Sequence, residues 1–298
     1  MTQSREQGEL IPVTLASPAA LTPAERAEIL EAREILEHHG IADRLTRAIG
    51  TPISASMRLL PSSVQGLIQA AVDRSLSKAL DAAIHTLSPA DAAQQPRLRG
   101  NQWMAGLVGA AGGAFGPAVL AAELPVSTIL ILRSVADIAR SQGEDLEQLE
   151  TRLACLEVFA LDSGGAATKS SGTASSSGKG SADLAEDATE IGYFAVRAAM
   201  AKQVAGATKY LATAQVIDHS APPLLRFISE IGKRFGVVVG QKVAAQAVPV
   251  IGAIGGALIN SYFIDHYQDL ARAHFTIRRL ERKYGTQTVQ AIYRGSPE

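Results

Sequence analysis

Two glycine-rich stretches decide the fold: GLVGAAGGAFGPAVLAAELP at residues 106–125 and VPVIGAIGGALINSYFIDHY at residues 248–267. The first belongs to a longer run, residues 100–122, which has six glycines, seven alanines and no charged residue and which Glu123 ends. The second belongs to an equally uncharged run, residues 243–264, which Asp265 ends. The two runs therefore read as copies of one structural unit.

Small residues recur four positions apart in both runs, as at Gly109 and Gly113 and at Gly252 and Gly256. In a helix this spacing places the small residues on one face, so that two helix backbones can approach closely. We expect two related Gly-rich helical hairpins that press against each other at the centre of the protein.

The two runs are also long enough to span a membrane, because about 20 apolar residues in a helix cross the hydrocarbon layer. The first run consists mainly of glycine and alanine, which favour insertion much less than leucine or phenylalanine. Pro249 and Asn260 interrupt the second. We expect tightly packed central helices rather than stable membrane spans; helices that enter a bilayer in some state are the alternative.

The overall composition is that of a folded protein, since 47% of the 298 residues are hydrophobic and 19% are charged. A formal net charge of -1 argues against nucleic acid as a partner. Cys155 is the sole cysteine, which excludes an internal disulfide and a cysteine zinc site. The N-terminal residues lack the apolar run of a secretory signal, so we expect a cytoplasmic protein.

Helical periodicity dominates the rest of the chain. Thr22, Pro23 and Glu25 form a helix start with a capping box, and an apolar stripe follows the helical period from Val64 to Leu87. We also expect a helix over residues 144–160, and breaks at Pro117 and Pro125. No stretch alternates as a strand does. The prediction is an all-α single domain at residues 21–298, with a flexible tail at residues 1–20 and a disordered Gly/Ser-rich insertion at residues 162–182.

Glu123 and Asp265 are the candidate catalytic residues, because a carboxylate at the end of an apolar helix can lie in a desolvated cleft and act as acid or base. The structural alternative is that each caps a helix or pairs with a basic residue such as Arg133, Arg197 or Arg278.

Several other polar residues are candidates for binding a ligand or lipid. Tyr193 and Arg197 are four residues apart and share a helix face, Arg133 and Asp137 share another, and Asn260 interrupts the second run. The segment 268–284 is basic on one side, and it includes Arg278 and Arg279 as candidates beside Arg272, Arg282 and Lys283. A cationic face beside an apolar run can dock on anionic headgroups; a solvated helix face is the alternative.

We expect no cofactor, no metal and no nucleotide. Asp265, His266, Asp269 and His274 resemble metal ligands by type, but their spacing does not place all four on one helix face, and no HExxH motif is present. The serine-rich stretch at residues 172–180 departs from a phosphate-binding loop, and no GxSxG nucleophile motif occurs.

The sequence resembles the EcsC protein family, bacterial proteins named after the third gene of an operon that encodes an ABC transporter. The likeness rests on the Gly-rich run leading into AELPVSTILILRSVADIA, on GYFAVR at residues 192–197, and on VPVIGAIGGALIN through HFTIRRLERKYG. It covers roughly residues 25–294, and it implies membrane association or a hydrolase-like role.

The function we expect is that of a cytoplasmic, non-enzymatic protein peripheral to the inner face of the cell membrane, which binds lipid or a membrane-protein partner. The alternative is a peptidase-like or esterase-like hydrolase with a polar site at the ends of the hairpins. In that alternative Glu123, Arg133, Asp137, Tyr193 and Asp265 would converge in one cleft.

Overall fold

A computed structural model describes the chain at residues 21–38, 40–50, 52–53, 57, 60–87, 117–162, 192–214, 216–247 and 252–295. These residues form helices and the segments that connect them, without a strand, which confirms the all-α prediction. The predicted tail at residues 1–20, residues 100–116 of the first Gly-rich run and all but the first residue of the predicted Gly/Ser-rich insertion lie outside the described residues.

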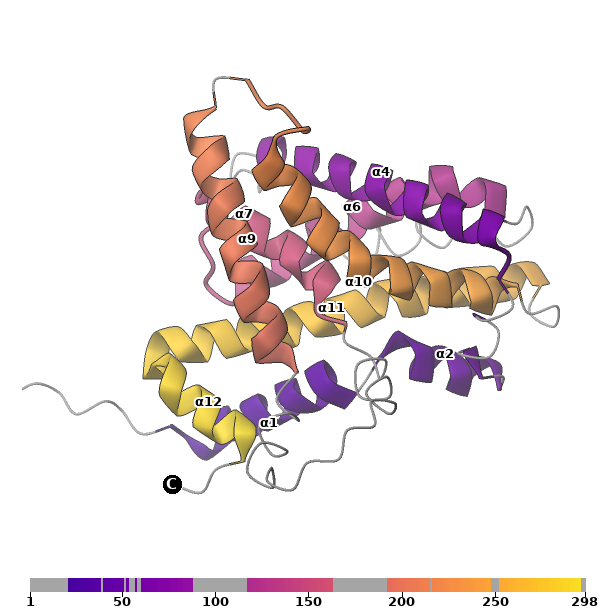
Figure 1. Cartoon of the computed structure of the whole chain (residues 1–298). Helices are drawn as coiled ribbons and strands as arrows, with labels where there is room; N and C mark the ends of the chain where they lie inside the picture. Colours follow the sequence, from indigo (N-terminus) through magenta and orange to yellow (C-terminus); the bar gives the residue numbers. More distant parts are fainter. Residues whose placement is uncertain are drawn as a thin grey trace, which may run out of the picture.

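The helices of the described residues are α1 (Pro23–His38), α2 (Ile41–Ile49), α4 (Ser62–His85), α6 (Pro117–Ser141), α7 (Leu149–Glu157), α9 (Tyr193–Thr213), α10 (Pro222–Gln246), α11 (Gly252–Tyr284) and α12 (Thr286–Arg294), with a short 3₁₀ helix, η2 (Val158–Ala160), after α7. The long helix α11 crosses the whole molecule (Figure 1). Helices α1, α2 and α12 pack along one side of it, and α6 and α10 pack on the other, with α4 beyond them (Figure 1).

Aromatic side chains fill the centre, where η2, α10 and α11 meet. Phe159 packs against Phe235 and Tyr267 with ring centroids 5.0 and 5.1 Å apart, and Tyr267 packs against Phe263 at 5.2 Å. All four rings are fully buried. These ring contacts tie the N-terminal part of α11, which contains residues 252–264 of the second Gly-rich run, to the core.

The predicted start of the first helix is confirmed in its details. The Thr22 hydroxyl accepts a hydrogen bond from the Glu25 backbone N–H at 3.2 Å, while the Glu25 carboxylate accepts one from the Thr22 backbone N–H at 3.1 Å. This reciprocal pair is a capping box, and it satisfies two donors that a helix N-terminus otherwise leaves open. Lys283 and Tyr284 also bind Glu25 and, with Thr22, lower its pKa.

Two predicted boundaries are wrong. Pro125 lies inside the continuous helix α6 instead of breaking it. The proline costs the helix one hydrogen bond, to the carbonyl of Ala121, and that residue is exposed to water. Next to the proline, the Ser127 and Thr128 hydroxyl groups donate hydrogen bonds to the carbonyl oxygens of Glu123 and Leu124.

The second wrong boundary is the start of the helix predicted from residue 144, because α7 begins only at Leu149. Gly143 has a φ of 78°, in the left-handed region, and the chain turns there. Asp145 then holds the turn by accepting hydrogen bonds from the Glu147 backbone and the Gln148 side chain at 2.9 and 3.1 Å. This turn, residues 142–148, faces the C-terminal half of α11.

Candidate functional site

A groove of about 400 Å³ lies between α4 and the N-terminal half of α6, which pack side by side (Figure 1). Its lining consists of two cations from α4 and five apolar residues from α6: Arg74, Lys78, Ala121, Ala122, Pro125, Val126 and Ile129. Ala121 and Ala122 are the last residues of the uncharged run 100–122. The last two residues of the run therefore line the groove.

The α6 side of the groove is apolar and open to solvent. Ala121 and Ala122 are exposed, and Val126 has 44% of its surface accessible. Ala122, Val126 and Ile129 are spaced four and three residues apart, so they form one stripe along the helix. The exposed valine in this stripe offers an apolar contact surface.

The α4 side carries the charge. Leu67, Arg74 and Lys78 are separated by seven and four residues and share one face of α4, and Leu67 is 49% exposed. Both cations are exposed, and no acidic side chain of the described residues lies within ion-pair distance of either. The neighbouring carboxylates have other partners, since Asp73 accepts a hydrogen bond from Gln69 and Asp81 pairs with His219.

The groove thus combines an exposed apolar floor with two positive charges that have no acidic partner among the described residues. An anionic amphiphile fits this pattern, because its charged group can meet Arg74 and Lys78 while its apolar part covers Val126. The described lining residues include no hydroxyl, thiol, imidazole or carboxylate side chain. Its chemistry is that of a binding surface.

Glu123, one turn before Val126, points away from solvent and belongs to a buried ion pair. Its carboxylate accepts a hydrogen bond from Lys242 Nζ of α10 at 2.8 Å, and the same nitrogen donates to Asn260 Oδ1 of α11 at 2.9 Å. Lys242 Nζ also lies 4.7 Å from the centre of the Phe263 ring. All three polar residues are buried, so the pair is shielded from water.

This polar cluster joins the described parts of both Gly-rich runs, because Glu123 ends the first run and Asn260 lies within the second. The partner of Glu123 is a lysine that the sequence analysis did not single out. The signal was present in the sequence: Lys242 is the one charged residue between Arg234 and Asp265, and it stands next to the second run. A lone cation in an apolar segment requires a buried partner.

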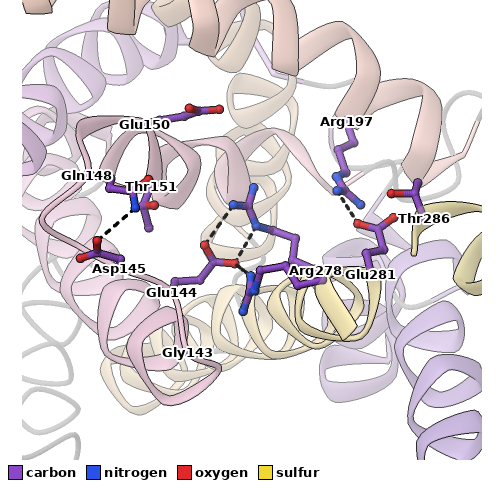
Figure 2. A pocket seen from close by; sticks show the side chains of 11 residues that line it. Gly143, Glu144, Asp145, Gln148, Glu150, Thr151, Arg197, Arg278, Glu281 and Thr286 are labelled. Carbon is purple, nitrogen blue, oxygen red and sulfur yellow. Dashed lines mark hydrogen bonds and ion pairs between the residues drawn. The ribbon is translucent and has the colours of Figure 1, made fainter. Parts of the chain in front are cut away.

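Tyr193 and Arg197 do lie on one face, and they contact each other and α11. The Tyr193 hydroxyl is 2.9 Å from His274 Nδ1, Arg197 Nη1 donates to that hydroxyl at 3.5 Å, and Arg197 Nη2 pairs with Glu281 at 2.5 Å (Figure 2 shows this last pair). Burial raises the pKa of Tyr193 and lowers that of His274. Both side chains are therefore neutral at physiological pH.

The basic residues of α11 form ion pairs with carboxylates: Arg272 with Asp269, Arg278 and Arg282 with Glu144, Arg279 with Glu28, and Lys283 with Glu25. The pair of Arg272 with Asp269 lies within α11, and the others attach α11 to α1 and to the turn at residues 142–148. Their positive charge is largely compensated within the protein, in contrast to that of Arg74 and Lys78.

The remaining predicted residues lie apart. Arg133 is exposed on α6, and Asp137 pairs with Arg140 at 2.9 Å while burial raises its pKa. Asp265 is half-buried on α11, and burial, with the nearby Asp269 charge, raises its pKa. Glu123 and Asp137 are separated by about 21 Å along α6, from the helical rise of 1.5 Å per residue. The structure does not bring these two carboxylates into one cleft.

Three of the four residues that resemble metal ligands have separate partners. His266 Nε2 is 2.8 Å from Asp162 Oδ2, His274 contacts Tyr193, and Asp269 pairs with Arg44 at 2.7 Å. Within the part of the chain that the structure describes, no group of three or more histidine, cysteine or acidic side chains is placed to bind a metal ion. The same part of the chain has no helix with the length and apolarity to span a membrane.

The chain belongs to the EcsC protein family, whose model matches residues 24–280. This confirms the resemblance that the glycine-rich and helical motifs indicate. No curated protein and no solved structure matches the chain. Family membership shows which proteins the chain is related to, and it does not by itself specify an activity.

Proposed function

We propose that the protein is a peripheral membrane protein of the cytoplasmic face, which binds anionic phospholipid through the groove between α4 and α6. One observation carries the proposal: two exposed cations, Arg74 and Lys78, flank an exposed apolar floor at the end of an uncharged run. A phospholipid presents the complementary pair, a negative phosphate beside hydrocarbon. The protein would lie on the bilayer surface with this face toward the lipid.

The charges favour lipid over other anionic partners. Each lysine or arginine close to an anionic membrane contributes about 1 kcal/mol of attraction, so Arg74 and Lys78 together contribute about 2 kcal/mol. Nucleic acid would require many more phosphate contacts than two cations can make. Leu67 and Val126 add apolar surface at the same place, as on helices that lie in a membrane interface.

A hydrolase remains without support from the arrangement of the candidate residues. Glu123 is buried against Lys242, and Asp137 lies far along the same helix. The mixed cationic and apolar surface is the better basis for a function, and membrane association also agrees with one of the roles that the family resemblance implies.

Co-flotation of the full chain with vesicles tests the proposal. The vesicles consist of phosphatidylcholine alone or of phosphatidylcholine mixed with phosphatidylglycerol. We expect the protein to float with the anionic vesicles and to remain below the neutral ones. The double variant Arg74→Gln/Lys78→Gln should bind the anionic vesicles about 30-fold more weakly, which is the equivalent of about 2 kcal/mol.

The matched control is Lys202→Gln/Lys209→Gln, which removes two exposed positive charges from α9. It should float like the wild type. Equal loss in both double variants would mean that net charge alone attracts the protein, and the groove would have no special role. A failure of the wild type to float with either kind of vesicle, together with binding to native membranes that contain protein, would replace lipid by a membrane-protein partner.

The apolar half of the groove needs its own variant. Val126→Ser keeps the charges and removes the exposed apolar side chain. We expect this variant to bind more weakly than the wild type at both low and high salt. The contribution of Arg74 and Lys78, in contrast, should vanish at high salt through screening. Unchanged flotation of Val126→Ser would exclude contact between α6 and the acyl region.

A further inference from the structure

A second cavity, of about 480 Å³, lies at the far end of α6 from the groove. The turn at residues 142–148, the start of α7, Arg197 of α9 and the C-terminal half of α11 surround it (Figure 2). Ala121 of the groove and Ser141 beside this pocket are separated by about 30 Å along α6, from the helical rise. The pocket is therefore independent of the surface that we propose for lipid.

Three guanidinium groups line the pocket, from Arg197, Arg278 and Arg282. Their side chains are 23%, 25% and 44% exposed, whereas the carboxylates that pair with them, Glu144 and Glu281, are 5% and 6% exposed. The acidic groups thus lie behind the basic ones. At this inner wall the pocket presents mainly guanidinium N–H donors to a ligand.

The carboxylates hold these donors in place. Arg278 Nε and Nη2 donate to the two oxygens of Glu144 at 2.8 and 3.0 Å, and Arg282 Nη1 donates to the same carboxylate (Figure 2 draws these contacts). Although burial opposes it, the two arginines hold the pKa of Glu144 below its ordinary value, so the carboxylate stays charged. Each guanidinium has five N–H donors, and these contacts leave some of them for a ligand.

One acceptor in the pocket lacks a donor. Glu281 uses Oε2 to pair with Arg197, while its buried Oε1 receives no hydrogen bond from the described residues. A buried carboxylate oxygen without a donor is costly, and a ligand that brings an N–H or O–H group would satisfy it. Thr151 also lines the pocket and adds a hydroxyl group.

Charge at the rim completes the pattern. Asp145 and Glu150 line the outer part of the pocket and are exposed. Both oxygens of Asp145 already accept hydrogen bonds from the turn. The pocket therefore offers convergent guanidinium groups for an anion and, beside them, carboxylate oxygens for a cation.

We propose that this pocket binds a phosphate ester that carries an ammonium group, with the phosphate on Arg278, Arg282 and Arg197 and the ammonium on Glu281 Oε1. Planar guanidinium forks match phosphate oxygens in pairs, which is why arginine clusters recognise phosphate. The cavity is larger than a phosphate ion alone, and it leaves room for the organic part of the ester. The group can come from a free phosphorylated amino alcohol or from a phosphoethanolamine lipid headgroup.

Isothermal titration of the full chain with three probes tests the site: O-phosphoethanolamine, ethyl phosphate and inorganic phosphate. We expect O-phosphoethanolamine to bind at least about 10-fold more tightly than ethyl phosphate, because a charge-assisted hydrogen bond to Glu281 contributes more than about 1.4 kcal/mol. Equal affinities, or no saturable binding of any probe, would overturn the proposal.

Two variants locate the probe. Arg282→Gln should weaken O-phosphoethanolamine and ethyl phosphate alike, by at least about 10-fold, since one phosphate contact is lost. Glu281→Gln should erase the preference for the ammonium-bearing probe, so that O-phosphoethanolamine and ethyl phosphate bind this variant with equal affinity. The control Arg133→Gln removes an exposed charge of α6 outside the pocket and should bind all probes like the wild type.

Circular dichroism of each variant confirms that it is folded, and an Arg282→Gln variant that is folded but binds like Arg133→Gln would refute the assignment.

Vesicles of phosphatidylcholine with phosphatidylethanolamine then distinguish the two sources of the ligand, the lipid headgroup and the free phosphorylated amino alcohol. If Arg282→Gln lowers flotation on these vesicles, the ligand is the lipid headgroup; if flotation is unaffected while titration is weakened, the ligand is a free molecule.

Discussion

Replacing Lys242 by methionine removes one buried charged group from the protein. Methionine has nearly the length of the lysine stem, so most of the side-chain volume is retained, while the contact of Lys242 Nζ with the Phe263 ring is lost. What the substitution removes is the ammonium group, which donates at 2.8 Å to Glu123 and at 2.9 Å to Asn260. The Glu123 carboxylate then stays buried without its counter-charge.

The size of the effect follows from that burial. Lys242 and Glu123 have side-chain exposures of 0% and 2%, so water cannot replace the lost partner. Removing one member of a buried ion pair costs about 3–5 kcal/mol, and the weakened hydrogen bonding of Asn260 adds about 1 kcal/mol. We expect a loss of about 4–6 kcal/mol, against a total stability of about 5–15 kcal/mol for a domain of ordinary stability.

Urea unfolding followed by circular dichroism measures this loss, and a second variant guards against a protein that no longer folds. Lys242→Met/Glu123→Gln removes the buried charge together with its partner, so it should be at least about 2 kcal/mol more stable than Lys242→Met alone. The control Lys209→Met, at an exposed position of α9, should change stability by less than about 0.5 kcal/mol.

Two results would refute the reasoning. A loss below about 1 kcal/mol in Lys242→Met would mean that water or a rearranged partner reaches Glu123. A double variant no more stable than the single one would mean that the lysine acts through packing, and that its charge does not matter.

Further predictions concern single residues elsewhere. Thr22→Ala should cost about 1 kcal/mol in urea unfolding, because the capping box at α1 is lost, and Thr22→Ser should retain most of it. Burial raises the pKa of Cys155 to about 12, so the native thiol should not react with a disulfide reagent at pH 8 and should react fully in denaturant; rapid native labelling would contradict its burial. Burial raises the pKa of Glu157 to about 7, above its ordinary value of 4.5. The folded protein therefore holds this proton more tightly than the unfolded chain, and the stability that results is complete below pH 4.5 and disappears as the pH rises through 7. This effect should lower the free energy of unfolding in urea by about 3 kcal/mol between pH 5 and pH 8, and Glu157→Gln should abolish it. An unchanged pH dependence in the variant would assign the effect to another group.

Local signals predicted the fold class and several elements correctly. The capping box at Thr22 and the apolar stripe from Val64 to Leu87 depend on contacts within three or four residues, and such contacts are visible in a sequence pattern. The prediction at Pro125 was wrong because the carbonyl group that loses its helix donor belongs to Ala121, which is exposed to water, and that exposure is a property of the folded helix.

The candidate site was harder to predict because its partners are far apart in the chain. Lys242 meets Glu123 across 119 positions, and Arg278 meets Glu144 across 134. A sequence pattern shows that α11 has a basic side, but not that carboxylates of α1 and of the turn at residues 142–148 already occupy it. Conversely, Arg74 and Lys78 gain importance only because α6 places an exposed apolar stripe beside them.

A polarity-sensitive fluorophore at position 126 tests the central claim, that the groove between α4 and α6 meets the lipid. The variant Val126→Cys can be labelled selectively, since the native Cys155 is buried. We predict that anionic vesicles shift the emission of this label to the blue and brighten it, whereas the same label at Lys209→Cys on α9 does not respond. A label at position 126 that reports water while the protein is bound to anionic vesicles would contradict the account.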